Sequence, residues 1–126
     1  MALVYILDDD QDLGDTINGM VSSLGHECQF FDDRDAFAAA VRKRPPQIYL
    51  IDMWLGKTTA LEVVAMFPDL LRGIPAIMMS GGGGPTSLET VTAIADMEGF
   101  VKVLYKPFQR AELEAILDEH LQDTRP

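Results

Sequence analysis

Five short apolar segments, each separated from the next by a stretch with helical periodicity, constrain the fold of this chain most strongly. Each segment is too short for a helix, and most are apolar on both faces, as strands buried in a parallel sheet are. The predicted strands are Ala2–Leu7, Glu27–Phe31, Gln47–Met53, Ile74–Met79 and Phe100–Leu104. Their alternation with helices predicts an α/β fold, a doubly wound parallel sheet with helices on both faces and right-handed crossovers.

The intervening segments carry helix start and stop signals. An apolar stripe from Leu13 to Leu24 predicts the first helix, which Gly25 ends. Carboxylates at Asp32 to Asp35 offer caps for a second helix over 36–41. Further helices are predicted over Ala60–Phe67, from Thr86, and from Pro107 to Leu121.

Composition narrows the class of protein. The 126 residues make about one domain, and the net charge of −10 argues against direct nucleic-acid binding, which needs a basic surface. A single cysteine, Cys28, excludes an internal disulfide and a cysteine-based zinc site. No apolar stretch approaches the roughly 20 residues of a membrane span. We therefore expect a small acidic domain of the cytoplasm that has no membrane contact.

Polar side chains follow the predicted strands where they end, at the edge of such a sheet where ligands bind. They are Asp8, Asp9 and Asp10 after the first strand, Asp52 at the end of the third, Ser80 at the end of the fourth and Lys106 just past the fifth. Converging carboxylates repel each other unless a cation lies among them, and Mg²⁺ prefers oxygen ligands and works beside phosphate. The pattern indicates a crevice in which an aspartate is phosphorylated.

Four motifs at these strand ends carry a family resemblance over nearly the whole chain. In order they are YILDDD, YLIDMWL, IPAIMMS and LYKPF, and together the chain resembles a receiver domain of bacterial two-component response regulators. The resemblance implies a flavodoxin-like sheet of five parallel strands in the order 2-1-3-4-5. Residues 1–122 would form the receiver, and residues 123–126 a tail or the start of a linker.

The resemblance also implies which residues carry the chemistry. Asp52 matches the phospho-acceptor and is also a metal ligand. Asp8 and Asp9 match the acidic pair that holds Mg²⁺, with Asp9 the better candidate for direct ligation. Trp54 would offer its backbone carbonyl to the metal, and Asp10 is assigned to capping. The Trp54 indole either covers the phosphoryl group and slows attack by water, or lies on the surface beside the loop.

Ser80 matches the hydroxyl that turns onto the phosphoryl group, and Lys106 matches the lysine that pairs with the acceptor. In the family the peptide bond from this lysine to the following proline is often cis. One position departs from the pattern, since the family usually has an aromatic residue where this chain has Val103. Tyr105, two residues on, either replaces that ring or packs under the last helix, and we favour packing.

A run of four glycines follows Ser80, beginning with Gly81 and Gly82, and lengthens this loop relative to the family. Consecutive amides could form an anion-binding nest, or the run could be a hinge for the following helix. We favour the hinge, because no lysine follows as a phosphate-binding loop requires.

The resulting hypothesis is a signalling switch that accepts phosphate from a sensor histidine kinase or a histidine phosphotransfer protein. It would signal to a downstream protein partner, and a homodimer through the face of the fourth helix, fifth strand and fifth helix is consistent with the resemblance. We expect no enzyme activity beyond its own phosphorylation and dephosphorylation. The alternatives are a pseudo-receiver that only docks, and a small phosphatase resembling the haloacid dehalogenase superfamily, in which Asp52 would be a bystander.

Overall fold

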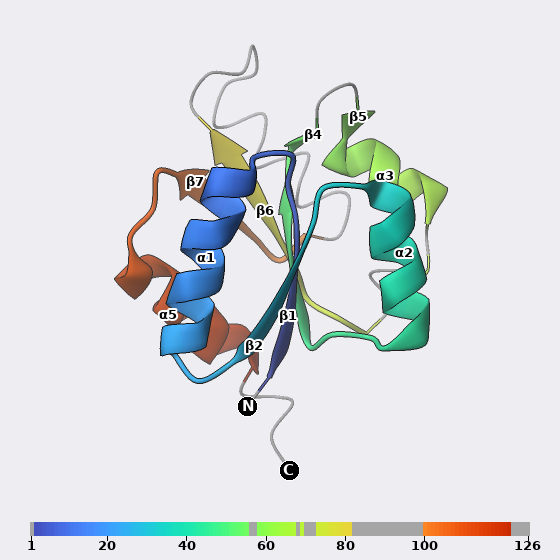
Figure 1. The fold of residues 1–126 in the computed structure, drawn as a ribbon. Helices are drawn as coiled ribbons and strands as arrows, with labels where there is room; N and C mark the ends of the chain where they lie inside the picture. Colours follow the sequence, from blue (N-terminus) through green and yellow to red (C-terminus); the bar gives the residue numbers. More distant parts are fainter. Residues whose placement is uncertain (1, 56–57, 68, 70–72, 82–99, 122–126) are drawn as a thin grey trace.

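A computed structural model describes residues 2–55, 58–67, 69, 73–81 and 100–121, with only the backbone described at Trp54, Thr58 and Leu61. Its centre is a sheet of five parallel strands (Figure 1). The strands are β1 (Leu3–Leu7), β2 (Glu27–Phe31), β3 (Ile48–Asp52), β6 (Ala76–Gly81) and β7 (Lys102–Lys106). They lie in the order β2-β1-β3-β6-β7, which confirms the predicted order 2-1-3-4-5.

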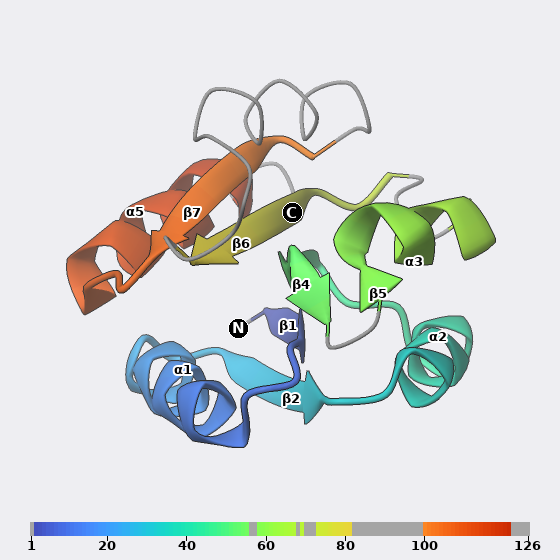
Figure 2. The ribbon, with the colours of Figure 1, turned by 90° about the horizontal axis from the view of Figure 1, so that it is seen from above.

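Helices cover both faces of this sheet (Figure 2). On one face lie α1 (Gln11–Ser23) and α5 (Arg110–Leu121), whose buried side chains pack with Ile6, Leu50 and Leu104. On the other lie α2 (Arg34–Lys43) and α3 (Ala60–Met66). The doubly wound architecture is confirmed. Among the helices that the structure describes, none is both long and apolar enough to cross a membrane.

Local sequence signals begin and end these helices. The Asp10 carboxylate accepts from the backbone amide of Leu13 at 3.1 Å, and the Asp33 carboxylate accepts from that of Ala36 at 2.9 Å. Both side chains thereby satisfy amides that a helix start leaves without a partner. Gly25 follows α1 with a φ of 87°, which a glycine adopts without strain. The cap expected of Asp10 is confirmed.

The structure corrects three predicted elements, and one of them is the fourth strand, which is Ala76–Gly81 instead of Ile74–Met79. The fifth strand is Lys102–Lys106, two residues later than predicted, because its ladder with β6 extends to a pairing of Gly81 with Lys106. Lys106 is therefore the last residue of the strand. The last helix begins at Arg110 instead of Pro107, and the carbonyl of Gln109 accepts from the backbone amides of Glu112 and Leu113.

A short hairpin after β3 was not predicted. It consists of β4 (Trp54–Leu55) and β5 (Thr58–Thr59), which pair antiparallel. Thr59 and Glu62 then form a capping box that begins α3. The helix expected from Thr86 lies outside the described residues.

Two glycines in α1 lead to opposite expectations for the same substitution. A Cβ at buried Gly14 would collide with the Phe30 ring of β2, whereas one at exposed Gly19 has no atom within 4 Å. We expect Gly14→Ala to lower the free energy of unfolding by about 1–2 kcal/mol through overpacking. Gly19→Ala should raise it by up to about 1 kcal/mol through helix propensity. Urea unfolding of both variants checks the pair, and an equal response would contradict the close packing at Gly14.

Two buried tyrosines provide a second matched pair. The Tyr5 hydroxyl donates to the carbonyl of Arg44 at 2.6 Å, whereas the Tyr49 hydroxyl has no hydrogen-bond partner among the described residues. Tyr5→Phe should destabilise the chain by about 1 kcal/mol, and Tyr49→Phe should leave stability unchanged or raise it, because no bond is lost. The midpoints of thermal unfolding measure both effects, and a larger loss in Tyr49→Phe would contradict the contacts seen here.

Candidate metal centre

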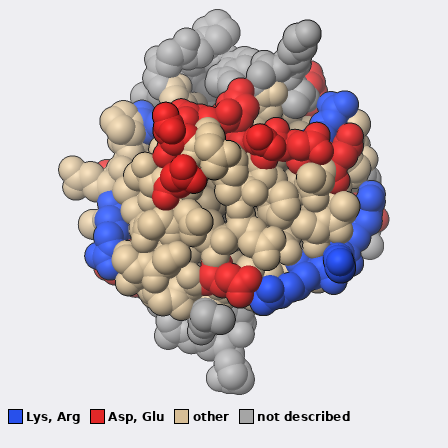
Figure 3. All heavy atoms as spheres, in the orientation of Figure 1, with Lys and Arg blue, Asp and Glu red and all other residues tan. Residues whose placement is uncertain are grey.

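Three carboxylates meet at the edge of the sheet where β1 and β3 end. Asp8 and Asp9 directly follow β1, and Asp52 is the last residue of β3. One carboxylate oxygen of each lies within 4.8 Å of the others. Asp8 and Asp52 are buried and Asp9 is exposed, so the cluster opens to solvent on one side. In Figure 3 acidic side chains gather along this same edge.

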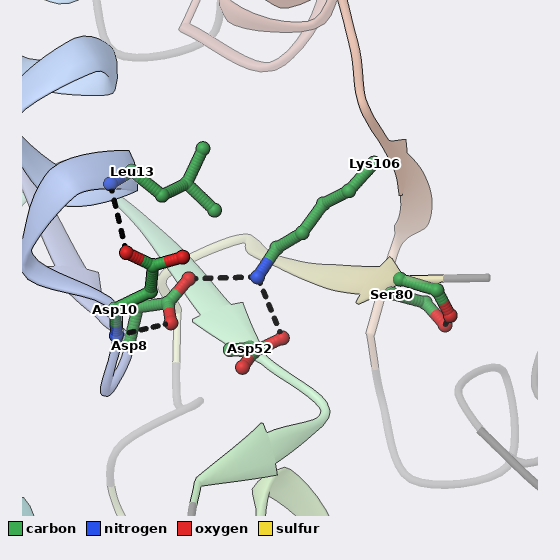
Figure 4. A network of polar contacts seen from close by, with 7 residues as sticks. Asp8, Asp10, Leu13, Asp52, Ser80 and Lys106 are labelled. Atoms are coloured by element: carbon green, nitrogen blue, oxygen red, sulfur yellow. Dashed lines mark hydrogen bonds and ion pairs between the residues drawn. The ribbon is translucent and has the colours of Figure 1, made fainter. Parts of the chain in front are cut away.

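Lys106 brings a positive charge into the cluster from β7 (Figure 4). Its Nζ donates to Oδ2 of Asp8 at 2.9 Å and to Oδ1 of Asp52 at 3.1 Å. The remaining Asp8 oxygen, Oδ1, accepts from the backbone amide of Asp10 at 3.0 Å. The ammonium thus neutralises part of a charge that the fold has taken out of water.

The electrostatics of the two partners follow from this burial. Burial and then the Asp8 charge raise the pKa of Asp52 from 3.8 to about 6, against the opposing effect of Lys106. Burial by itself would lower the pKa of Lys106, but its bonds and charge interactions with Asp8 and Asp52 outweigh it and raise that pKa. At neutral pH Asp52 is ionised and lacks enough positive charge around it.

The donor set fits a hard divalent cation. Carboxylate oxygens are the ligands that Mg²⁺ takes, the cluster reaches solvent at exposed Asp9, and a metal would add positive charge beside Asp52. After Asp52, the backbone amide of Ala60 donates to the carbonyl of Met53 at 3.0 Å. Trp54 opens β4 in this turn, next to the cluster along the chain. The two interpretations of the Trp54 indole fall on a side chain outside the described part of the structure.

Ser80 is the predicted site residue that the structure does not join to this network. It is buried at the end of β6, and its hydroxyl donates to the carbonyl of Gly81 at 3.5 Å. In Figure 4 it stands apart from the bonds between Lys106 and the carboxylates. Side chains alternate between the two faces of a sheet, so Ser80 lies on the same face as Met78, two residues before it. Met78 packs on the face that α2 and α3 cover. Lys106 lies on the same face as Leu104, which packs on the face that α1 and α5 cover.

The predicted modulators lie close to Ser80. Val103 and Tyr105 pair with Met78 and Ser80 across the β6–β7 ladder, so they share one face of the sheet. Val103 packs against the core of that face, and Tyr105 is half-buried. Gly81 pairs with Lys106 at the end of the ladder, and Gly82 lies outside the described residues.

The Lys106–Pro107 peptide bond is cis, as the resemblance implied. The hairpin after Asp52 is the part of the site that was missed in the sequence. The sequence pattern that could have indicated it is the spacing of Thr59 and Glu62, which is that of a capping box and locates the start of α3.

Comparisons with known proteins converge on one family. Residues 4–118 match the response regulator receiver domain. Curated relatives include the nitrogen assimilation regulatory protein NtrX of Azorhizobium caulinodans, 27% identical over 97% of this chain and 26% of the relative. Another is the response regulator protein TodT of Pseudomonas putida, 27% identical over 89% of this chain and 48% of the relative. The chain spans about a quarter to a half of the length of these relatives.

Solved structures agree with this match. The receiver domain of NtrX from Brucella abortus superposes with a TM-score of 0.78 at 29% identity, covering 94% of this chain and 98% of that one. A CheY-like receiver domain protein from Methanospirillum hungatei shares the fold, with a TM-score of 0.84 at 21% identity, covering 98% and 95%.

Neutralising Asp52 tests the electrostatics of the cluster. Since the pKa of Asp52 in the folded chain lies above 3.8, its ionisation at pH 7 reduces stability. Asp52→Asn should therefore raise the free energy of unfolding by about 1–2 kcal/mol without divalent cations. Mg²⁺ should stabilise the wild type and have much less effect on this variant. Urea unfolding at pH 7 with EDTA or Mg²⁺ measures both effects.

Asp10→Asn is the matched control, because asparagine also caps a helix and Asp10 lies outside the cluster. It should keep the wild-type response to Mg²⁺. A less stable Asp52→Asn protein in EDTA would contradict the charge imbalance.

Proposed function

The chain belongs to the response regulator receiver domain family of two-component signalling, and from that premise we propose that it is a Mg²⁺-dependent phosphoryl-accepting switch with Asp52 as acceptor. The observation that carries the proposal is the Lys106 ammonium bound to both Asp8 and Asp52, beside exposed Asp9. A nucleophilic carboxylate, oxygen ligands for a metal and a fixed cation are the groups that acyl phosphate formation needs.

In the proposed reaction an oxygen of ionised Asp52 attacks the phosphorus of a phosphohistidine on a partner protein. The bond from phosphorus to the imidazole nitrogen breaks, the imidazole leaves, and an acyl phosphate forms on Asp52. Asp8, Asp9, Asp52 and the Trp54 carbonyl would hold Mg²⁺, which when bound supplies positive charge to the phosphoryl oxygens. Lys106 would bind a phosphoryl oxygen in place of the Asp52 oxygen that it now contacts.

Ser80 and its neighbours would report the phosphorylated state. For this the Ser80 hydroxyl must leave the Gly81 carbonyl and turn toward the phosphoryl group. Val103 has no ring to follow that movement, so the signal would pass through the β6–β7 face that also carries Tyr105. The favoured partners are a histidine kinase or phosphotransfer protein as donor and a downstream protein as receiver of the signal. A homodimer through the fourth helix, β7 and α5 belongs to the same proposal.

Two other functions compete with this one. In a phosphatase of the haloacid dehalogenase type Asp52 would be a bystander, and its direct bond to Lys106 inside the acidic cluster argues against that role. A pseudo-receiver would keep the fold without the reaction. The retained ion pairs among Asp8, Asp52 and Lys106 favour a working site, because burying unused charge is costly.

Intact mass after incubation with acetyl phosphate and Mg²⁺ tests the proposal. We expect one phosphoryl gain in the wild type, none in Asp52→Asn, and none when EDTA replaces Mg²⁺. Asp9→Asn should reduce the gain strongly by weakening the metal site, whereas Asp10→Asn should leave it unchanged. Absence of any gain in the wild type would favour the pseudo-receiver, and a gain that persists in Asp52→Asn would exclude Asp52 as the acceptor.

A further inference from the structure

The Asp8 carboxylate has both of its oxygens in use. Oδ1 accepts from the Asp10 amide at 3.0 Å and Oδ2 accepts from Lys106 Nζ at 2.9 Å. The side chain is completely buried, so it has no contact with bulk solvent. Asp52 presents one oxygen, Oδ1, to the same ammonium at 3.1 Å. A single lysine therefore binds both buried members of the three-carboxylate cluster.

A metal ion bound to Asp8 would need an oxygen that already accepts a hydrogen bond. Mg²⁺ demands near-octahedral oxygen ligands at about 2.1 Å, closer than any ammonium hydrogen bond. One oxygen from each carboxylate lies within 4.8 Å of the other two, so the three carboxylates could share one ion. A divalent ion on Asp8 and Asp52 would lie next to a positive charge that contacts both, and the two cations would repel.

We propose that Lys106 is the resident cation of the metal-free site and competes with Mg²⁺ for Asp8, an inference that rests on the metal site of the proposed function. The ammonium keeps the buried carboxylates compensated when metal is absent, and it lowers the affinity of the site for Mg²⁺. When the metal binds, Lys106 leaves Asp8 and keeps its contact with Asp52. Metal occupancy thereby changes the position of a side chain at the end of β7.

Calorimetric titration with Mg²⁺ at fixed ionic strength and pH tests this competition in four proteins. Lys106→Met removes the charge at nearly constant length and should bind Mg²⁺ about tenfold more tightly than the wild type. Lys106→Arg keeps the charge and should bind with nearly wild-type affinity. Lys102→Met removes the same charge from the exposed start of the same strand and should also match the wild type.

The opposite result is expected if Lys106 positions the carboxylates for metal binding. In that case Lys106→Met would bind Mg²⁺ more weakly than the wild type, and our inference would be wrong. Equal affinity in Lys106→Met and the wild type would overturn it too. A gain of the same size in Lys102→Met would show a general charge effect and would also exclude competition at Asp8.

Stability provides a second readout, because Lys106→Met leaves two buried carboxylates without a cation. It should unfold at lower urea than the wild type in EDTA and gain more stability from Mg²⁺. If this variant does not fold in EDTA, Lys106→Gln replaces it, since the amide still donates to Asp8 without a charge, and the same tighter binding is expected. Wild-type binding without a gain in the neutral variants overturns the competition alone. Failure of every variant to bind Mg²⁺ overturns the metal site of the proposed function as well.

Discussion

The ammonium of Lys106 between Asp8 and Asp52 is the interaction on which the candidate site depends. It joins the ends of three strands, across 98 residues to Asp8 and 54 residues to Asp52. Two carboxylates that are almost completely buried would repel each other at this edge without it. The positions of β1, β3 and β7 in the sheet are therefore tied to one charge, and the site can form only when the whole sheet does.

Even with Lys106 in place, burial and then the neighbouring Asp8 charge keep the pKa of Asp52 raised, so ionised Asp52 is held at a free-energy cost. The stability of the domain must come from elsewhere, mainly from apolar side chains packed on the two faces of the sheet. This division leaves the polar edge able to gain stability from an added cation. A site that is under-compensated in the folded state is suited to binding a metal and then a phosphoryl group.

The alternation of side chains divides this edge into two parts. Asp52 and Lys106 continue the α1–α5 face, while Ser80, Val103 and Tyr105 continue the other. The proposed acceptor and the proposed reporting residues are thus neighbours along the sheet edge, but their side chains belong to opposite faces. The ends of β6 and β7, where Gly81 pairs with Lys106, lie between these two groups. Val103 belongs to the group that contains Ser80.

The sequence by itself determined the order of strands and helices, because apolar periodicity and capping side chains act over a few residues. It also brought Asp8, Asp9, Asp52 and Lys106 together, since parallel strands end at one edge. Only the tertiary structure decided where β7 and α5 begin, that Ser80 turns to Gly81, and that a hairpin follows Asp52. Those features depend on the register between strands that are distant in the chain and on which oxygen accepts a buried hydrogen bond. Local periodicity carries no information on either.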